Sequence, residues 1–431
     1  MKRAEVFVVG AGPAGIAAAV RAAECGRGVT VLDDNPAAGG QIWRGGGSEK
    51  AREWFTAFKR SGAEFASGAR VIAGDAERRV LRVETAMRAF DIEYGELILA
   101  TGGRELFLPF PGWTLPNVTG AGGLQALVKQ GLKVSGKRVV VAGSGPLLLA
   151  VAAFLRAKGA TVAAVVEQAS PARLARFGLH LFRHPAKLAQ AVALAPTLYM
   201  PGSWVVAAEG GDCVERAIIH TPRGTRTIAC EYLAVGFGLW PNAELARHLG
   251  CAVIDNAVAV DEFQRTSVAG IYCAGEAAGI GGLDPAITAG EVAGHAAGGR
   301  EDLARRRFEA RAAGRRFADA LKEAFALRPE LRDLPRPETI VCRCEDVRLA
   351  AIQDRDSWRA AKLHLRCGMG PCQGRVCGPA AQWLFGWTVE SVRPPIFPAR
   401  VASLISEHEH ALGGSDAGHN HRIPRGSDGG L

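Results

Sequence analysis

Residues 6–33 place the strongest constraint on how this 431-residue chain can fold. They read as a strand (6–9), a glycine turn, an alanine-rich helix (16–24) and a second apolar strand (29–32) that ends at an acid. The turn fits the G-x-G-x-x-G pattern, in which the glycines allow a tight turn, close approach of a pyrophosphate and close helix packing. The acid can accept hydrogen bonds from the adenosine ribose, so this stretch predicts a dinucleotide site built from Gly10, Gly12, Pro13, Ala14, Gly15 and Asp33. No arginine follows Asp33, so a 2′-phosphate is not expected.

Three later stretches fit the same first domain. The glycine-rich loop 36–47 can run close under a large flat ligand, while a plain flexible loop is the alternative. A buried strand at 96–100 ends in small residues, and a second glycine turn at 274–282 precedes a helix over 286–297 whose N-terminus can stabilise negative charge. The residues expected to contact the ligand from these stretches are Gly40, Gln41, Thr101, Gly102, Gly275 and Glu276.

A second nucleotide fingerprint begins at residue 138. Gly143 and Gly145 keep the first two glycines of the pattern, but Leu148 replaces the third, so helix and strand must lie slightly further apart. Glu167 ends the following strand and is placed for a ribose hydroxyl. We expect a degenerate site that holds NAD or ATP; a folded but empty domain is the alternative.

Five of the ten cysteines fall within residues 342–377, as a C-x-C pair, a 22-residue gap, and Cys367, Cys372 and Cys377. A [2Fe–2S] cluster takes two thiolates per iron, and glycines beside the thiolates let backbone N–H groups approach the sulfides. Structural zinc is the alternative, although C-x-C is an awkward zinc knuckle. We predict the ligands Cys342, Cys344, Cys367 and Cys372. Cys377 is the alternate ligand, expected to lie one helical turn further on, behind the Gly374 bend.

The remaining features limit the classes of function. The five other cysteines are isolated on apolar stretches, and no C-x2-C or C-x4-C pair lies near either fingerprint, which argues against a disulfide reductase. The net charge of +9 owes much to arginines in 300–336, which we interpret as a solvated helix face or subunit contact and not as a nucleic-acid patch. No apolar run is long enough to span a membrane, and no signal peptide is expected. We expect a cytoplasmic protein, with a peripheral position at the inner face of the membrane as an alternative.

Two resemblances bring these motifs together. Residues 1–103, with the Ala-Thr101-Gly102 segment, resemble the two-dinucleotide-binding-domain flavoproteins of the glutathione-reductase-like superfamily, which implies FAD in the first site and an NAD-type second domain. Members carry Gly-Asp where this chain has Gly275-Glu276. The strings Cys-Arg-Cys-Glu-Asp-Val347 and Arg-Cys-Gly-Met-Gly-Pro-Cys-Gln-Gly-Arg-Val-Cys377 look like the bacterioferritin-associated-ferredoxin-like module.

In this form the module is similar to that of α subunits of heteromeric dye-linked amino-acid dehydrogenases, a group that includes the opine oxidase, D-hydroxyproline dehydrogenase and hydrogen cyanide synthase types. The resemblance implies an FAD- and [2Fe–2S]-containing electron-transfer subunit. An amino-acid-oxidase-like flavoprotein β subunit, with a small ferredoxin-like γ subunit as a further candidate, would oxidise the C–N bond of an amino acid, imino acid or opine. The alternative is a self-sufficient NAD(P)H-dependent flavin and iron–sulfur reductase that passes electrons to a ferredoxin-like acceptor.

The predicted fold class is α/β, with two Rossmann-like domains of the glutathione-reductase-like type and a small α-rich [2Fe–2S] module at the C-terminus. The first domain is discontinuous and holds FAD. Residues 170–204 are predicted as a helical insertion in the second domain. The full prediction is an FAD domain at 1–113 and 250–300, a second nucleotide domain at 114–249, a helical connector at 301–337, the cluster module at 338–400, and a disordered tail at 401–431.

Overall fold

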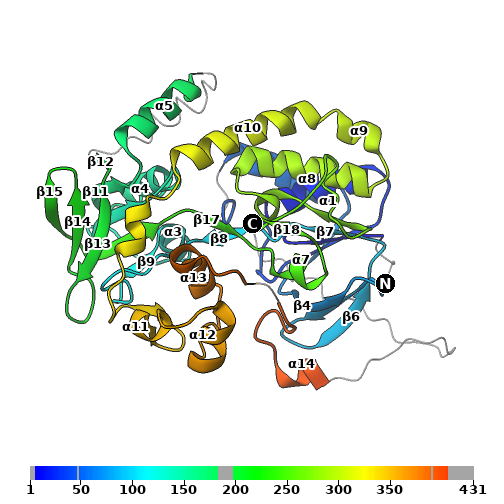
Figure 1. The fold of residues 1–431 in the computed structure, drawn as a ribbon. Coiled ribbons are helices and arrows are strands. Elements are labelled where there is room, and N and C mark those ends of the chain that lie inside the picture. Colours follow the sequence, from blue (N-terminus) through cyan, green and yellow to red (C-terminus); the bar gives the residue numbers. More distant parts are fainter. Residues whose placement is uncertain (1–4, 46–47, 183–197, 390–391, 406–431) are drawn as a thin grey trace. The chain divides into compact units, whose positions relative to one another are not determined.

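The structure is a computed structural model that describes residues 5–45, 48–182, 198–389 and 392–405. It divides into two compact units (Figure 1). The first unit combines residues 1–103, 241–316 and 391–431, and the second combines 104–240 and 317–390. The helical insertion predicted for 170–204 falls partly on 183–197, and the predicted tail falls largely on 406–431; both stretches lie outside the described residues.

A five-stranded parallel sheet forms the centre of the first unit, in the order β20-β7-β1-β2-β3. Its strands are β1 (Val6–Val9), β2 (Val29–Leu32), β3 (Glu64–Ala66), β7 (Glu96–Leu99) and β20 (Ile271–Cys273). Alternate residues point to opposite faces. Val6 and Val8 pack under the helices α1 (Pro13–Glu24), α2 (Glu49–Arg60) and α8 (Leu283–Ala297). Phe7 faces the antiparallel sheet of β4 (Arg70–Asp75), β5 (Val80–Glu84) and β6 (Ala89–Glu93).

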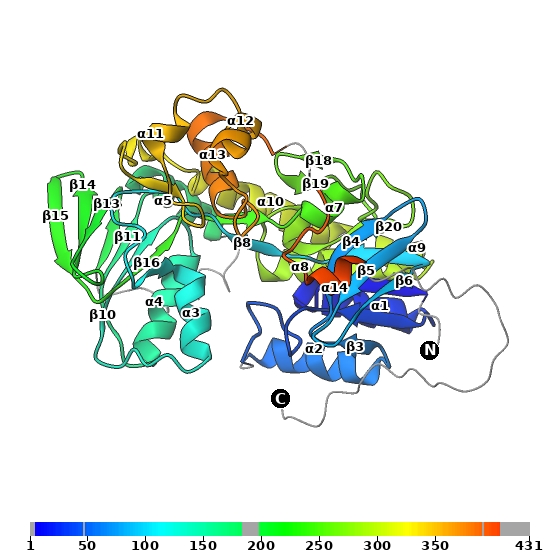
Figure 2. The same ribbon diagram turned by 90° about the horizontal axis from the view of Figure 1, so that it is seen from below.

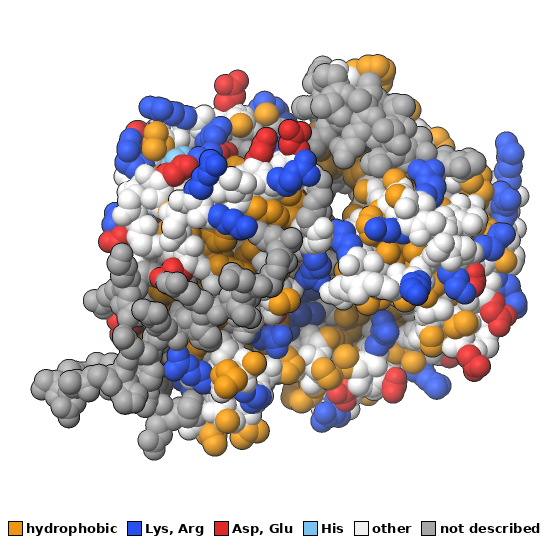
Figure 3. All heavy atoms as spheres, turned by 180° about the vertical axis from the view of Figure 1, so that it is seen from behind, with side chains coloured by type: hydrophobic (Ala, Val, Ile, Leu, Met, Phe, Trp, Pro, Cys, Tyr) orange, Lys and Arg blue, Asp and Glu red, His pale blue; other side chains and the backbone are white. Residues whose placement is uncertain are grey.

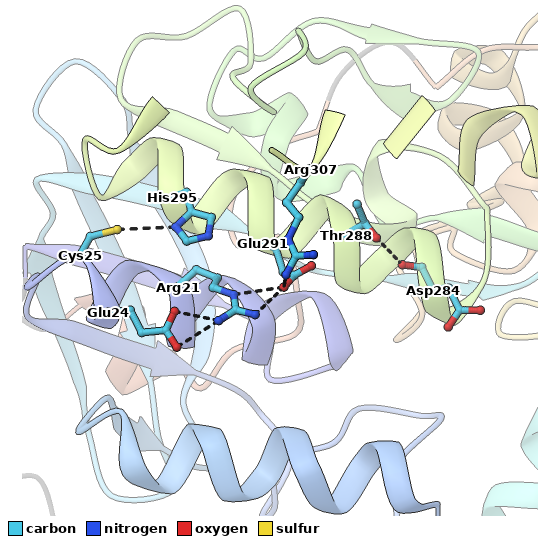
Figure 4. Close-up of polar contacts among 8 residues, drawn as sticks. All are labelled: Arg21, Glu24, Cys25, Asp284, Thr288, Glu291, His295 and Arg307. Carbon is cyan, nitrogen blue, oxygen red and sulfur yellow. Dashed lines mark hydrogen bonds and ion pairs between the residues drawn. The ribbon is translucent and has the colours of Figure 1, made fainter. Parts of the chain in front are cut away.

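The helices α1 and α8 pack backbone against backbone, which glycine makes possible. A Cβ added at Gly290 would lie 2.2 Å from the carbonyl oxygen of Ala14, and one at Gly294 would lie 2.3 Å from that of Ala18. On the outer side of this pair, buried Glu291 accepts from Arg21 at 2.6 Å and from Arg307 at 2.7 Å (Figure 4). Figure 4 also shows His295 of α8 beside Cys25, with Nδ1 3.7 Å from the thiol sulfur. These contacts tie the two sequence pieces of the first unit together.

Short elements complete the first unit: α7 (Glu244–His248), β18 (Val253–Ile254), β19 (Ala257–Val258), η1 (Gly275–Ala278), α9 (Glu301–Arg305) and α14 (Val401–Ile405). The last described segment returns to this unit, where α14 lies beside the β4-β5-β6 sheet (Figure 2). Ser403 donates to Glu84 at 2.6 Å, and the backbone N–H of Ile396 donates to Ile72. The structure therefore groups residues 392–405 with the first unit, although the sequence pattern placed them in the cluster module and the tail.

The second unit repeats the same plan. Its parallel sheet, in the order β12-β11-β10-β16-β9, contains β9 (Val118–Gly120), β10 (Arg138–Gly143), β11 (Thr161–Glu167), β12 (Tyr199–Pro201) and β16 (Tyr232–Gly236). Helices α3 (Ala121–Lys129) and α4 (Leu147–Ala157) pack on one face. The antiparallel strands β13 (Trp204–Glu209), β14 (Arg216–Thr221) and β15 (Gly224–Ala229) cover the other. Helix α5 (Pro171–Leu181) begins the predicted insertion.

The C-terminal part of the second unit is mainly helical. After α10 (Phe308–Ala324), it contains η2 (Pro329–Asp333), the hairpin β21 (Ile340–Cys342) and β22 (Val347–Arg348), and the helices α11 (Leu349–Ile352), α12 (Trp358–Leu365) and α13 (Cys377–Phe385). The short pair β8 (Gly103–Glu105) and β17 (Leu239–Pro241) lies where the chain passes between units. The predicted fold class is confirmed: two Rossmann-like domains and a small module.

Two surface properties bear on the class of protein. No helix within the described residues is long and apolar enough to cross a membrane. On the face drawn in Figure 3, Lys and Arg side chains are interspersed with acidic and apolar ones and do not gather in one patch. This distribution agrees with interpreting the excess of arginine as solvated surface.

The close packing of α1 on α8 predicts a large effect from a single methyl group. Gly290→Ala should lower the free energy of unfolding by about 1–3 kcal/mol, because the added carbon collides with backbone and not with a movable side chain. Denaturant titration of the full chain measures this. Gly178→Ala in α5 is the matched control: its Cβ would meet nothing within 4 Å, so the free energy of unfolding should stay equal or rise slightly. Equal stability of both variants would contradict the packing argument.

Candidate flavin and thiol sites

The first glycine turn has the close contacts that a dinucleotide fold requires. Gly10 has φ +105°, and a Cβ there would lie 2.3 Å from the carbonyl oxygen of Ala100. A Cβ at Gly15 would lie 1.8 Å from the carbonyl oxygen of Gly10, so the helix can start here only without side chains. Gly12 caps α1, and Pro13 and Ala14 form its first turn. The turn therefore aims the N-terminus of α1 at the carboxyl edge of the sheet.

The acid after β2 is held by its neighbours. One carboxylate oxygen of Asp33 accepts from the backbone N–H of Ala11 at 2.6 Å. The other accepts from the backbone and side-chain amides of Asn35 at 2.8 and 2.7 Å. Arg44 in turn donates to the Asn35 amide oxygen at 2.6 Å. The sequence motifs did not reveal Asn35 and Arg44, because their role depends on how the loop folds back.

The glycine-rich loop lies directly over the turn. A Cβ at Gly40, which has φ +58°, would lie 2.9 Å from the Cα of Gly12. Gln41 is exposed. Trp43 is 3% exposed, and its indole N–H has no hydrogen-bond partner among the described residues. Such a buried donor usually meets a ligand or water.

The third and fourth predicted stretches meet the first at the same edge. Thr101 donates to the carbonyl of Asn242 at 2.6 Å, and the Asn242 amide donates to the carbonyl of Thr101 at 2.9 Å. Gly102 adopts φ +69°, and its carbonyl accepts from the backbone N–H of Asn242. A Cβ at Gly275 would lie 2.7 Å from the Cβ of Ala14. The structure thus brings residues 10–15, 101–102 and 275 into one neighbourhood of the first unit.

Glu276 is the part of this neighbourhood that most clearly awaits a ligand. Burial raises the pKa of its carboxyl group. No hydrogen bond or ion pair from the described residues reaches the carboxylate. A buried carboxylate without a partner is costly, and sugar hydroxyls would supply the missing donors. The glycine turn, the Gly40 loop and Glu276 together fit FAD.

The second nucleotide fold keeps the geometry of the turn. Gly143 follows β10 with φ +142°, and Gly145 has φ +103°. Glu167 is fully buried at the end of β11, and its two oxygens accept from the N–H groups of Gly145 and Ala169, each at 2.8 Å. Burial raises the pKa of Glu167 to about 7 despite these bonds. The carboxylate meant for a ribose is therefore already satisfied by the chain.

All five cysteines of the predicted cluster stretch gather in the helical module. The thiol sulfurs of Cys342, Cys367 and Cys377 lie within 4.8 Å of one another, and all three residues are buried. The Cys377 thiol also contacts Cys372, which in turn contacts the exposed Cys344. Cys377 was expected to lie apart from the ligands, behind the Gly374 bend; that expectation is wrong, because it begins α13 with its thiol among the others.

Glycines and one tryptophan shape the thiol loops. The backbone N–H of Gly368 donates to the Cys342 sulfur at 3.5 Å, as expected for a thiolate site. Trp358 packs under the loop, since a Cβ at Gly368 would lie 2.5 Å from its ring and one at Gly374 3.1 Å. Trp113 donates to the carbonyl of Ile340 at 2.6 Å and anchors the hairpin that carries Cys342. Trp358 and Trp113 carry no motif and were not predicted.

Known proteins with similar sequences share this architecture. A family model for pyridine nucleotide-disulphide oxidoreductases matches residues 4–294. Hydrogen cyanide synthase subunit HcnB of Pseudomonas aeruginosa is 31% identical over 425 residues, covering 86% of this chain and 90% of that protein. The A-type subunit of opine oxidase from Agrobacterium tumefaciens is 32% identical over 467 residues, covering 93% and 91%. Among solved structures, L-proline dehydrogenase from P. horikoshii superposes with a TM-score of 0.66 at 18% identity, covering 93% of this chain and 79% of that one.

The unpartnered carboxylate leads to a prediction on flavin retention. Glu276→Ala should weaken FAD binding by about ten- to a hundredfold, the worth of a lost hydrogen bond to a charged group. The flavin-to-protein ratio after dialysis, together with a flavin titration of the stripped chain, measures it. Glu276→Asp keeps the charge and should retain most of the flavin. Wild-type affinity in the alanine variant would show that Glu276 does not contact the cofactor.

Proposed function

We propose that this chain, which belongs to the pyridine nucleotide-disulphide oxidoreductase family, is an electron-transfer subunit of a heteromeric dehydrogenase or oxidase. The chain is an FAD-dependent oxidoreductase. The proposed substrate bond is the C–N bond of an amino acid, imino acid or opine, oxidised on a partner flavoprotein subunit. When bound, FAD and a [2Fe–2S] cluster would supply carriers for the two electrons that the oxidation of an amine to an imine releases.

The convergence of five thiols in one small module carries this proposal. Four thiolates are what a [2Fe–2S] cluster takes from its protein, and the loop that bears Gly368, Gly370 and Gly374 brings backbone close to sulfur. A Cβ at Gly370 would lie 2.2 Å from that of Cys344, so the two cysteine-bearing loops touch. Two relatives that cover most of the chain are named as subunits, which supports a hetero-oligomer.

The contacts among the thiols favour one ligand set. Cys342 contacts Cys377, Cys377 contacts Cys372, and Cys372 contacts Cys344, which lies two residues from Cys342. These four thiols form a ring with two members from each loop, while Cys367 lies fully buried beside it. We therefore propose Cys342, Cys344, Cys372 and Cys377 as the ligands. The set with Cys367 in place of Cys377 is the competing choice.

Serine replacement of each cysteine in turn tests the ligand set. Iron content and the visible spectrum after anaerobic purification should fall strongly for the four proposed ligands, because serine is a poor replacement for thiolate at iron. Cys367→Ser should keep near wild-type iron, and Cys230→Ser, at a buried cysteine outside the module, serves as the control for general destabilisation. Loss of iron from Cys367→Ser with retention in Cys377→Ser would reverse the assignment. Zinc in place of iron in the wild type would overturn the cluster.

The partner requirement tests the function itself. The chain alone should not reduce a dye with any amino acid or opine, whereas the chain purified together with its natural partner subunit should do so. A partner complex that contains Cys344→Ser should bind substrate normally and lose most dye reduction. Rapid dye reduction with amino acids by the isolated chain would contradict the proposed division of work.

A further inference from the structure

The second nucleotide-binding fold is covered by a segment of its own chain. Residues 325–328 follow α10 and lie against the glycine turn and the end of β11 within the second unit. Ser144, between the two glycines of the turn, donates to the carbonyl of Phe325 at 2.8 Å. Arg173 of α5 donates to the carbonyl of Ala326 at 2.9 Å. The segment is thus fixed at the place where a dinucleotide would enter.

Gln168, the residue after Glu167, fastens this cover. Its amide nitrogen donates to Ser144 Oγ at 2.8 Å and reaches the carbonyls of Phe325 and Ala326 at 3.4 and 3.3 Å. Its amide oxygen accepts from the backbone N–H of Arg328 at 3.1 Å. Gln168 and Glu167 are both 0% exposed. One side chain therefore uses both ends of its amide to hold the segment over the turn.

The anchoring continues beyond the cover. The Arg328 guanidinium lies 4.7 Å over the Trp204 ring and pairs with Glu330 at 2.6 Å. Leu331 and Leu334 then enter the core between the parallel and antiparallel sheets. Opening the segment would have to break these contacts as well as the bonds to Gln168.

A dinucleotide needs the positions that the cover takes. In this fold the acid at the end of the second strand binds the adenosine ribose hydroxyls. Here both Glu167 oxygens are used by Gly145 and Ala169, and the covered edge leaves the carboxylate no exposed surface. Space remains beside Gly145, where a Cβ would meet nothing within 4 Å, so the ribose end is closed and the turn itself is not. In the first fold, by contrast, Asp33 is held by the nearby residues 11 and 35.

An internal carboxylate fills another anion-binding position on the same edge. Glu105 accepts from the N–H groups of Gly122 and Gly123 at 2.7 and 2.9 Å, at the N-terminus of α3. Leu148, in place of the third glycine, packs toward Gly236, where an added Cβ would lie 3.6 Å from it. A phosphate group would have to compete with a carboxylate that the chain already supplies.

We propose that residues 325–328, fastened by Gln168, exclude NAD(H) from the second fold and so determine which electron donor the chain accepts. This inference rests on the proposed function and deepens it, because a chain closed to NADH must receive its electrons from a partner. Gln168 is a specificity-determining residue in this account and touches no reacting atom. The self-sufficient NADH-dependent reductase is the function that it opposes.

The test compares NADH binding with exposure of the cover in the full, flavin-loaded chain. Calorimetric titration with NADH should show no saturable binding by the wild type up to millimolar concentration. Hydrogen exchange should show the amides of residues 325–328 protected. Gln168→Ala should raise exchange in this segment and tighten NADH binding at least about tenfold, the effect of removing one or two hydrogen bonds from the closed state.

Two further variants keep the test decisive. Arg173→Ala removes an exposed side chain that donates to Ala326, so it should fold normally and loosen the segment to a smaller degree. Gln130→Ala changes an exposed glutamine of the same unit and should leave exchange and NADH binding at wild-type values.

Either of two results would overturn the proposal. One is micromolar NADH binding by the wild type with residues 325–328 still protected. The other is a fully exchanging segment in Gln168→Ala or Arg173→Ala with no gain in NADH binding. The proposed function fails separately, if the chain with its natural partner does not support amino-acid oxidation; that result leaves the NADH titration unchanged.

Discussion

Contact between backbones, permitted by missing Cβ atoms, is the constraint on which the first unit depends. Gly15 brings α1 against the turn that starts it, and Gly290 and Gly294 bring α8 against α1. This packing joins residues 10–33 to residues 271–297, which are separated by more than two hundred positions in sequence. The flavin site exists only because both pieces reach the same sheet edge. Glu276, carried on the second piece, then presents an unpartnered carboxylate to it.

The two nucleotide folds share one plan and differ in what covers them. Each has a five-stranded parallel sheet with helices on one face and a three-stranded antiparallel sheet on the other. In the first, the loop at Gly40 lies across Gly12 and leaves a buried donor, Trp43, without a partner among the described residues. In the second, Gln168 and residues 325–328 satisfy the polar groups of the edge from within the chain. The same topology can therefore hold a cofactor in one half and exclude one in the other.

Much of this could be predicted from sequence, because glycine spacing and cysteine spacing report local geometry. The fold class, the turn at Gly10–Gly15 and the gathering of thiols near residue 342 all follow from such local patterns. The position of Cys377 could not, since it depends on how α13 packs beside the hairpin at Cys342. The cover over Glu167 was equally invisible, because Gln168 meets a segment about 160 positions away. Long-range contacts of this kind leave no periodic trace in the chain.

The central claim is that electrons reach the thiol module from a partner's oxidation of a C–N bond and not from NADH. The most direct measurement is low-temperature paramagnetic resonance of the partner complex, mixed anaerobically either with substrate or with NADH. The account predicts the signal of a reduced [2Fe–2S] cluster with substrate and none with NADH. A full cluster signal with NADH and none with any amino acid or opine would contradict it.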